Sequence, residues 1–395
     1  MRFGLGFGID VRRGGLPFPR SLFASGEQGI WLDPSDFSTL YQDSAGTTPV
    51  TALGQPVGLA LDKRLGLALG PELVTNPGPF TATTGWTASA AVLSTSSGSL
   101  IVTNSSAGIY AKAQTTITTI AGAWYKVNVT AQAGTLAPAV WVGTSVGGSQ
   151  LLAFSGVIGQ TKTAYFLAQG TTTHVQILGS NVLGETAAVS LVSSKLIAGN
   201  HAYQTTAASR PTLQQDSNGL YYLSFDGTDD SMATPSINFT GTDKMTVWAG
   251  VRKLSDAAAG TVVELSASAT ANLGGFFLRA PQAAASTYSF LSGGSAFSTA
   301  VSSSGYVAPI SNILTGIGDI SGDACSLRVN GTTVTSATDQ GTGNYGNYPL
   351  YIGRRGGTTL PFNGRIYQLI IRGAESNAGQ IAATEAWCNS KTRAY

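Results

Sequence analysis

Alternation of apolar and polar residues is the main pattern of this chain from about Leu73 onward. In "YKVNVTAQ", residues 125–132, every second side chain is Tyr, Val or Ala, and the side chains between them are polar. A period of two predicts a half-buried antiparallel strand. Similar runs separated by Gly, Ser and Asn continue to Val192, including "GSLIVTN", "PAVWVGTS", "TAYFLAQG" and "THVQILG". Their spacing predicts an all-β sandwich.

A second series of strand-like runs begins near Leu220 and includes "LYYLSFDG", "KMTVWAGVR", "GTVVELSAS" and "GRIYQLIIRG". The pair Asn330-Gly331, between "LRV" and "TTV", predicts a hairpin because both residues tolerate a positive φ. Only the tail "ESNAGQIAATEAWCNSKTRA" predicts a helix, with Asn377 as its N-cap and Gln380 three residues on. The expected fold class is therefore all-β, with two antiparallel β-sandwiches and a short C-terminal helix.

Composition agrees with a folded, weakly charged protein that is rich in turns. The chain has 395 residues, of which 43% are apolar and 11% charged, with 50 glycines. This length allows two domains of ordinary size. The net charge is +2 and the basic residues are scattered, so neither nucleic acid nor an anionic membrane is an expected partner. No secretory leader and no apolar run long enough to span a bilayer is recognised, so membrane insertion is not expected.

The chain has two cysteines, Cys325 and Cys388, which lie far apart in sequence and outside any CxxC or His-rich context. That arrangement argues against a zinc site of the usual spacing. The two thiols either pair in the fold or stay free in the core, and the sequence leaves both alternatives open. No cofactor is expected.

The first strand series has an unusual chemistry, because no Asp or Glu occurs between Leu73 and Gly184. A glycosidase needs two carboxylates and calcium sites are usually built with them, so neither is expected inside this segment. Aromatic residues stand instead among Ser, Thr, Asn and Gln, which suits the stacking and hydrogen bonding of a neutral glycan. The carbohydrate-binding candidates in this segment are Trp86, Tyr110, Trp124 and Trp141. The alternative for each one is an ordinary position in the core.

Two further candidates lie near the C-terminus. Tyr345 and Tyr348, in "NYGNYPLYIGRRGG", precede a pair of arginines in a mixed aromatic and basic loop that could contact a sugar or a protein. A turn followed by the start of a strand explains the same residues equally well.

The phrase "FDGTDD" contains the acidic group Asp226, Asp229 and Asp230, a weak calcium candidate. An ordinary turn is the favoured interpretation, because Asp bonds its own backbone there and Gly supplies a positive φ. No HExxH, GxSxG or Walker motif is present, so the protein is not expected to be an enzyme. The catalytic alternative is a polysaccharide depolymerase that uses these carboxylates or Glu264.

From Leu220 to the C-terminus, an ordered set of motifs runs FDG-x-DD, the NG hairpin, "YPLYIGRR" and "FNGRIYQLIIRG". This set resembles the laminin-G-like, concanavalin A-like jelly-roll family of lectin domains. The resemblance implies a jelly-roll fold. It leaves the ligand open, because the family includes sugar binders, protein binders and structural modules.

An earlier stretch, "WLDPSDFSTLYQD", resembles the opening of this jelly roll in tailed-bacteriophage virion proteins. Those proteins continue through a "DKSGNGNHA-Q" phrase into "RPTL", but here "LALDKR" ends at Arg64 and "GNHAYQ" begins at Gly199. Residues 66–198 are therefore predicted to be a domain inserted between 27–65 and 199–395. The start of the insert, "ELVTNPGPFTATTGWTAS", resembles family 4/9 carbohydrate-binding modules. Insertion at a surface loop has a small entropic cost.

The nested arrangement predicts that Trp31 packs against residues beyond Gly199. It also predicts that the acidic residues of this stretch, Asp33, Asp36 and Asp43, are turn residues that bond nearby backbone groups.

The virion resemblance implies a non-enzymatic protein of the particle surface, either a tail fibre or a head decoration, that binds a bacterial surface glycan. A purely structural cement protein is the alternative. Residues 1–26 are predicted to be an arm that docks on other virion proteins. The resemblance also implies a homo-oligomer, with the trimer as the common state of such proteins, although the sequence contains no heptad repeat that supports it.

Overall fold

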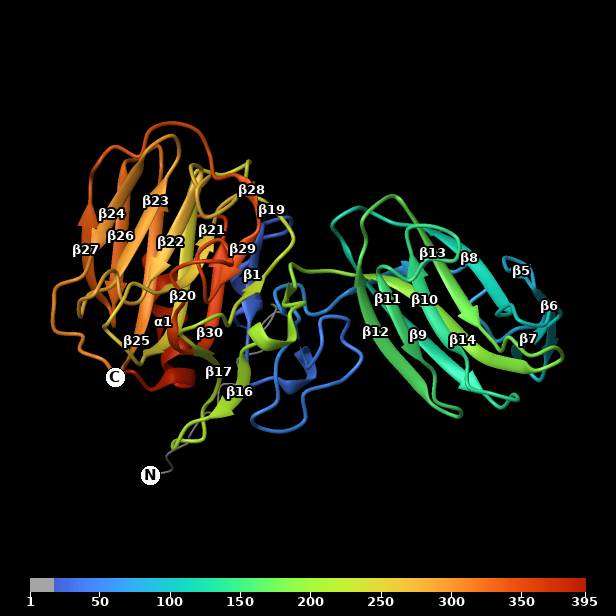
Figure 1. Cartoon of the computed structure of the whole chain (residues 1–395). Helices are drawn as coiled ribbons and strands as arrows, with labels where there is room; N and C mark the ends of the chain where they lie inside the picture. Colours follow the sequence, from blue (N-terminus) through green and yellow to red (C-terminus); the bar gives the residue numbers. More distant parts are fainter. Residues whose placement is uncertain (1–17) are drawn as a thin grey trace, which may run out of the picture.

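The computed structural model describes residues 18–395 and confirms the predicted fold class of antiparallel β-sandwiches with a C-terminal helix. The chain forms two bodies side by side, one made of residues between Leu69 and Ile197 and the other of residues on both sides of that segment (Figure 1). We call them the inserted sandwich and the host sandwich. Among the described residues, no helix is long and apolar enough to cross a membrane.

The host sandwich contains an eight-stranded and a nine-stranded sheet. The eight-stranded sheet has the order β16 (Thr212–Gln215), β17 (Tyr221–Asp226), β30 (Asn363–Arg372), β20 (Lys244–Lys253), β25 (Ile310–Asp319), β26 (Ala324–Val329) and β27 (Thr332–Ser336), with β1 (Gly29–Leu32) also paired to β30. The nine-stranded sheet has the order β2 (Leu40–Tyr41), β3 (Leu59–Ala60), β15 (Ala202–Tyr203), β18 (Met232–Ala233), β29 (Leu350–Ile352), β21 (Thr261–Leu265), β22 (Gly275–Arg279), β23 (Ser289–Gly293) and β24 (Phe297–Val301). A small ribbon pairs β19 (Ile237–Asn238) with β28 (Asn347–Tyr348).

The inserted sandwich contains a five-stranded and a six-stranded sheet. The five-stranded sheet has the order β11 (Leu152–Ser155), β10 (Ala139–Gly143), β13 (Thr172–Leu178), β8 (Lys112–Thr118) and β5 (Thr87–Ser89). The six-stranded sheet has the order β12 (Thr161–Leu167), β9 (Trp124–Gln132), β14 (Thr186–Ile197), β7 (Ser99–Asn104) and β6 (Ala91–Ser96), with β4 (Leu69–Glu72) also paired to β14. The alternating burial of β9 follows its alternating sequence, and the apolar faces of both sheets meet in one core.

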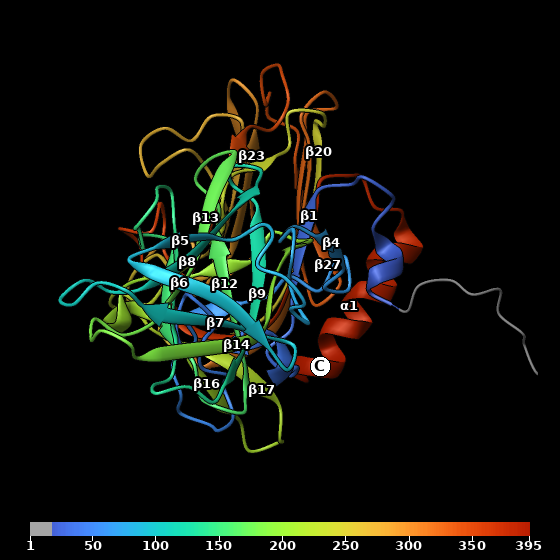
Figure 2. The same cartoon turned by 90° about the vertical axis from the view of Figure 1, so that its right-hand side faces the viewer.

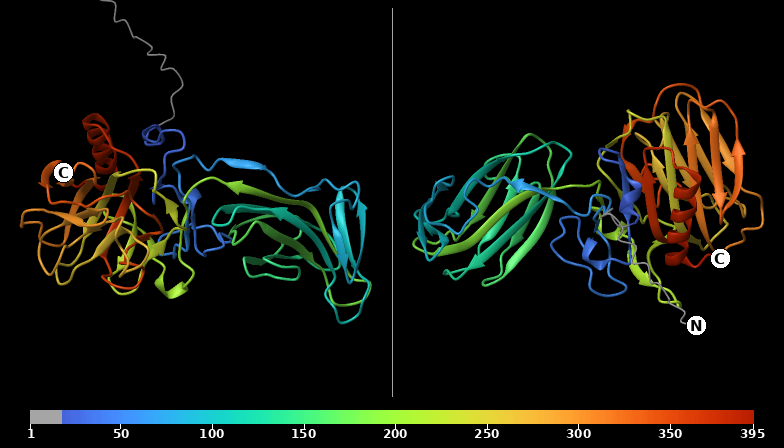
Figure 3. Two further views of the ribbon diagram at one scale, coloured as in Figure 1. Left: turned by 90° about the horizontal axis from the view of Figure 1, so that it is seen from above. Right: turned by 180° about the vertical axis from the view of Figure 1, so that it is seen from behind.

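The outer face of the eight-stranded sheet is covered by the helix α1 (Ala378–Thr392) (Figures 2 and 3). Its N-terminus has the predicted capping box, in which Asn377 and Gln380 bond each other's backbone. The helix comes so close to β20 that a side chain at Gly250 would collide with Thr392. The hairpin prediction is also confirmed, because Asn330 and Gly331 both have positive φ.

The two cysteines are free and buried on opposite sides of the eight-stranded sheet. Cys325 belongs to the core between the host sheets, whereas Cys388 lies on α1. The alternative of a disulfide is therefore not realised.

The part of the predicted N-terminal arm that the structure describes packs on this chain. Residues 18–26 include the 3-10 helix η1 (Arg20–Leu22), and Leu22 and Phe23 are buried beside α1. Phe18 contacts the edge of Trp387 with 5.7 Å between ring centroids. These apolar side chains pack beside Trp31 and Trp387 of the host sandwich, so this part of the predicted arm is ordered on its own chain. The rest of the prediction, residues 1–17, lies outside the described residues.

Trp31 packs against residues beyond Gly199, since β1 pairs with β30 and places Trp31 opposite Ile370. Its indole nitrogen donates to Gln368 at 3.2 Å. The segment that follows is a turn in which Asp33 accepts from Ser35, with the 3-10 helix η2 (Phe37–Thr39) after it. The acidic residues of this stretch are thus turn residues.

The chain leaves and re-enters the host sandwich at one place, where β3 pairs with β15. Here the carboxylate of Asp62 is buried and accepts three backbone N–H groups at 2.9 Å, from Trp31, Arg64 and Asn200. The N–H of Asp62 donates to Nδ1 of His201 at 2.9 Å. The two parts of the interrupted phrase therefore meet in space.

Apolar contacts between the two sandwiches extend from this crossing. We define the interdomain joint as the buried cluster of Leu59, Leu61, Trp124, Tyr165 and Ile197. Tyr41 and Tyr165 share a hydroxyl hydrogen bond of 2.9 Å, and the N–H of Tyr165 donates to the carbonyl of Ala45 at 2.7 Å. Leu59 and Leu61 of the joint belong to the host sandwich, and its other three residues belong to the six-stranded sheet. A short 3-10 helix, η3 (Ala207–Ser209), follows the re-entry.

Replacing Asp62 by Asn should destabilise the protein by about 3–5 kcal/mol, because the Arg64 guanidinium 3.6 Å away would lose its buried counter-charge. Urea-induced unfolding measures this change. The control is Asp36→Asn, because Asp36 is partly exposed and Lys63 keeps its second partner, Asp33. It should cost less than about 1 kcal/mol. An equal decrease in the free energy of unfolding in the two variants would contradict a special contribution of Asp62 to stability.

Burial, and secondarily the charge of Arg64, lowers the pKa of His201 from 6.5 to about 3. Below pH 6.5 the unfolded chain binds a proton that the folded chain excludes, so this histidine lowers stability as the pH falls toward about 3. His201→Asn keeps an acceptor for the N–H of Asp62. It should remove a pH dependence of up to about 1.4 kcal/mol per pH unit.

Urea unfolding from about pH 7 to about pH 4 measures that slope. The matched control is His174→Asn, since the sequence has two histidines and His174 lies on the surface of the inserted sandwich. This control should keep the wild-type slope. If the free energy of unfolding had the same pH dependence in the wild type and in His201→Asn, the buried imidazole would not be its cause.

Candidate functional site

The outward face of the five-stranded sheet carries a row of polar and aromatic side chains. Strand register pairs Trp141 with Gln176, Gln176 with Gln114, and Gln114 with Thr87. Directly paired residues of antiparallel strands point to the same side, so an indole, two amides and a hydroxyl cross β10, β13, β8 and β5 in line. The residues between them, such as Val140, Ala113 and Val175, point into the core.

A cleft of about 460 Å³ lies at the β5 and β8 side of this row. We call it the sheet cleft. Its walls are formed by Thr75, Gly85, Trp86, Thr87, Gln114, Thr115, Thr116, Val146 and His174. Nδ1 of His174 and the hydroxyl of Thr116 lie 3.4 Å apart across the two neighbouring strands. No Asp or Glu is among these lining residues, so the sheet cleft is an uncharged polar surface with an apolar edge.

The loop between β10 and β11 folds over part of the row and forms one wall. The N–H of Gly147 donates to Oε1 of Gln176 at 2.9 Å, and Nε2 of Gln176 donates to the carbonyl of Gly148 at 2.8 Å. Both ends of this amide are therefore used. Gln114 differs, because its Oε1 is buried and has no hydrogen-bond partner among residues 18–395. A buried acceptor without a donor is costly, and the rest of the half-buried Gln114 side chain lines the sheet cleft. A rotation of this side chain toward the cleft would bring its oxygen to a ligand hydroxyl.

Trp141 is the aromatic platform of this face. It is half-buried on β10, and Nζ of Lys112 lies 5.5 Å from the centroid of its ring. A cation over an indole is attracted by the ring electrons and holds the side chain in place. Lys112 is thus a functional candidate that the sequence did not single out, as are Gln114 and His174. Alternation in "AKAQTT" places the first two on the polar face of their strand, but their distance from Trp141 depends on strand register.

Three of the predicted sugar-binding aromatic residues are buried, which removes their ring faces from contact with a ligand. Trp124 is 3% exposed in the interdomain joint, where it meets Tyr203 edge-on at 5.5 Å. Tyr345 is 1% exposed in the host core and shares a hydrogen bond of 2.6 Å with Ser292. Trp86 is 8% exposed and donates to the carbonyl of Asn76, so little of its ring is accessible from the sheet cleft. For all three, packing explains the residue.

The other predicted residues are accessible but are not all brought together. Trp141 lies in the row described above. Tyr110 is exposed in the loop just before β8, two residues from Lys112, and is not part of the sheet cleft. Tyr348 is half-buried against the host core, on β28, far along the chain from the others. Of the six aromatic candidates, Trp141 alone lies on the sheet face with its ring partly accessible, among the residues described.

The acidic group of the host sandwich forms the predicted turn. Oδ1 of Asp226 accepts from the N–H groups of Thr228 at 2.7 Å and Asp229 at 3.2 Å, and Gly227 has a positive φ. Oxygens of Asp226, Asp229 and Asp230 lie within 4.8 Å of one another, so these are the residues that could hold a divalent cation. Burial, together with the charge of Asp226, raises the pKa of Asp230 to about 6. The turn accounts for the cluster without an ion.

Glu264, the other carboxylate considered for catalysis, is fully buried on β21. Its Oε2 accepts from the N–H of Gly356 at 3.2 Å. Burial raises its pKa, an effect that outweighs the nearby charges of Arg355 and Arg279. Glu264 therefore lies inside the host sandwich, where its carboxylate does not reach the surface.

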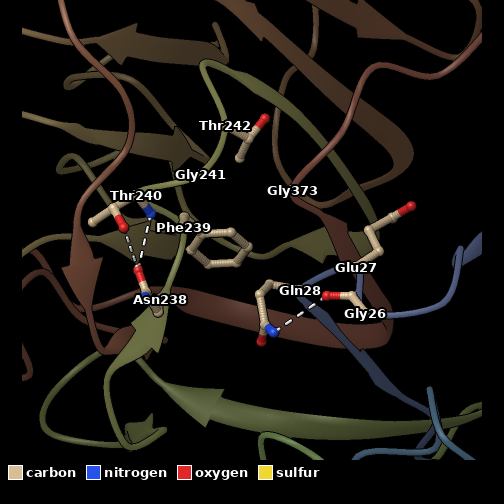
Figure 4. A pocket seen from close by; sticks show the side chains of 9 residues that line it. All are labelled: Gly26, Glu27, Gln28, Asn238, Phe239, Thr240, Gly241, Thr242 and Gly373. Carbon is tan, nitrogen blue, oxygen red and sulfur yellow. Dashed lines mark hydrogen bonds between the residues drawn. The ribbon is translucent and has the colours of Figure 1, made fainter.

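A second cleft, of about 410 Å³, lies on the host sandwich near β19 (Figure 4). Its polar side chains bond within the wall, as Asn238 accepts from the N–H and hydroxyl of Thr240 and Gln28 donates to the carbonyl of Gly26. Its aromatic residue, Phe239, is 1% exposed. Without an accessible ring face, it is less suited to a sugar than the sheet cleft.

Comparison with known proteins supports the class of the host sandwich. Residues 226–382 match the model of the concanavalin A-like lectin/glucanases superfamily. The matched residues include strands β18 to β30 and the start of α1. This part of the host sandwich is thus similar to concanavalin A-like lectin, or laminin G, domains, as the motifs predicted. None of the curated proteins matches the chain.

Several solved structures are similar in part. The CBM40 module of the Ruminococcus gnavus IT-sialidase is 15% identical, with a TM-score of 0.30, over 37% of this chain and 84% of that chain. The same module has been solved bound to alpha2,3 sialyllactose, with 16% identity and a TM-score of 0.30 over 36% of this chain and 83% of that one. The binding domain of botulinum neurotoxin serotype D is 12% identical, with a TM-score of 0.33, over 46% of this chain and 47% of that chain. At these TM-scores the likenesses bear on no functional residue.

Proposed function

We propose that the protein is a non-catalytic carbohydrate-binding protein and that its inserted sandwich holds a neutral glycan on the open face of the five-stranded sheet. The observation that carries this proposal is the row from Trp141 to Gln114, which ends beside the sheet cleft with an unpartnered buried amide oxygen. The host sandwich would present this module as part of a larger surface protein.

The chemistry of the row fits a sugar ring. An indole face can pack against the C–H groups of a pyranose, and hydroxyl groups of the sugar can donate to Oε1 of Gln114. Thr87, Thr116 and His174 add groups that both donate and accept, as sugar hydroxyls require. The volume of about 460 Å³ is within the ordinary range of small-molecule sites.

Binding rather than turnover is proposed, because a glycosidase places two carboxylates around the scissile bond. The lining of the sheet cleft has none, and the segment from Leu73 to Gly184 supplies none. In the host sandwich, Glu264 is buried and the Asp226 group is bonded to its own turn.

We further propose that the protein acts on a virion surface, as a tail fibre or head decoration that binds a bacterial glycan. This proposal is supported by the interrupted phage-type phrase, whose two parts meet at Asp62 and His201. Docking through the N-terminal arm, residues 1–26, and assembly into a homo-oligomer belong to the same proposal. The structural alternative, a cement protein without glycan binding, is favoured by the burial of Trp124, Tyr345 and most of Trp86.

The full chain should bind at least one neutral polysaccharide on an array of bacterial surface glycans. Trp141→Ala and Gln114→Ala should each weaken that binding by about tenfold, because they remove the stacking platform and the buried acceptor. The control is Tyr395→Ala, which removes an exposed aromatic ring from the host sandwich and should bind like the wild type. Absence of binding across the array, or full binding by Trp141→Ala, would favour the structural alternative.

A further inference from the structure

A polar groove of about 400 Å³ lies on the host sandwich, on the outer face of the eight-stranded sheet. It is bounded by the turn between β16 and β17, by strands β20 and β30, and by the C-terminal end of α1. We call it the arginine groove. Arg252, Arg365 and Arg393 line it, together with Asp216, Tyr222 and Tyr367.

Two of these arginines are direct cross-strand neighbours. Register pairs Arg252 of β20 with Arg365 of β30, and Ser224 and Ser311 flank them in the same row. The outward direction of the row is clear, because the adjacent residues Val251 and Ile366 belong to the core. Like charges placed directly opposite each other on a sheet destabilise it, so an anion bound to both guanidinium groups would stabilise this pairing.

The arginines are held in position by uncharged groups. The guanidinium of Arg252 donates to the Ser311 hydroxyl at 3.2 Å, and that of Arg365 lies 4.5 Å from the centroid of the Tyr222 ring. Arg393 follows α1 with a positive φ of 48° and its N–H bonded to Asn389. The contacts fix both guanidinium groups of the pair but neutralise neither.

The carboxylate in the groove is already engaged. Oδ1 of Asp216 accepts the N–H groups of Asn218 and Leu220 at 2.8 and 3.0 Å, and Oδ2 accepts the Tyr367 hydroxyl at 3.1 Å. Within residues 18–395, no carboxylate oxygen lies within 4.0 Å of a side-chain nitrogen of Arg252, Arg365 or Arg393.

Two other arginines of the host sandwich are paired with carboxylates. Arg328 binds Glu385 through two nitrogens, at 2.7 and 3.1 Å, and Arg372 binds Glu27 in the same way, at 2.6 and 2.8 Å. These pairs have the parallel geometry that a guanidinium makes with a carboxylate. Arg252 and Arg365 have no such partner, although each is the direct cross-strand neighbour of the other.

We propose that the arginine groove binds a phosphate group. Three guanidinium charges against the one charge of Asp216 leave an excess of two positive charges, which matches the ≈ −1.5 to −2 charge of a phosphate monoester at neutral pH. Two adjacent planar guanidinium groups can each bind two of its oxygens, and the serine hydroxyls of the row can donate to a further oxygen. The bound group is either free phosphate or a phosphate carried by a sugar.

This site is separate from the sheet cleft, since it lies on the other sandwich and selects a charged ligand. It does not depend on the proposed glycan site, and each can fail alone. A variant of the groove should keep binding of neutral glycan, and Trp141→Ala should keep binding of phosphate.

The test is thermal unfolding of the full chain in inorganic phosphate against chloride at equal ionic strength. The wild type should gain a saturable rise in Tm with phosphate. Arg365→Gln and Arg252→Gln should lose that rise, and without phosphate they should unfold at or above the wild-type Tm because the repulsion is relieved. Lys126→Gln, which removes the same charge from the inserted sandwich, should respond to phosphate like the wild type.

Titration calorimetry with inorganic phosphate, glucose 6-phosphate and glucose distinguishes the sources. Binding of glucose 6-phosphate about tenfold tighter than phosphate would assign a phosphorylated sugar, and equal affinities would assign the free ion. A wild-type Tm that phosphate does not raise above the chloride reference, or an undiminished rise in both Arg→Gln variants, would overturn the proposal.

Discussion

The buried carboxylate of Asp62 is the constraint on which the two-body structure depends. The chain passes beside this carboxylate twice, once where it leaves the host sandwich and once where it returns. The carboxylate accepts backbone N–H groups from both of these segments and from β1. Burying a charge is costly unless it is fully hydrogen-bonded, so the three segments have little freedom to move apart. The pairing of β3 with β15 follows, and with it the closure of the nine-stranded sheet around an insertion.

The interdomain joint decides which face of the inserted sandwich is free. Trp124, Tyr165 and Ile197 come from β9, β12 and β14, which all belong to the six-stranded sheet. One end of the six-stranded sheet is therefore packed against the host sandwich. The five-stranded sheet supplies no residue to the joint cluster, so its outward row and the sheet cleft remain open to a ligand. Burial of Trp124 is thus part of the geometry that leaves Trp141 accessible.

The sequence was informative where a local rule decides the structure. Alternation marked the strands, Asn330-Gly331 marked a hairpin, Asn377 and Gln380 marked the helix start, and the interrupted phrase indicated the insertion. It failed where a contact depends on strand register or on packing between sandwiches, because a one-residue slip moves every side chain to the other face. Nothing near Trp124 distinguishes a joint residue from a sugar platform, and nothing near Lys112 indicates that it lies over Trp141.

Polar groups without a partner occur in both sandwiches, and their position relative to a cleft separates candidate binding positions from structural ones. In the host sandwich Glu385 accepts from both Arg328 and Thr315, so a buried charge there is compensated by several partners. Arg252 and Arg365 lack a partner of opposite charge, and Oε1 of Gln114 in the inserted sandwich lacks a hydrogen-bond donor. Other buried polar atoms of the described residues also lack a partner, such as Nε1 of Trp124 and Nε1 of Trp248. What distinguishes Arg252, Arg365 and Gln114 is their position beside a groove or cleft, where a bound ligand would offset the cost in stability. The exceptions on the two sandwiches differ in charge, so the ligands that satisfy them must differ as well.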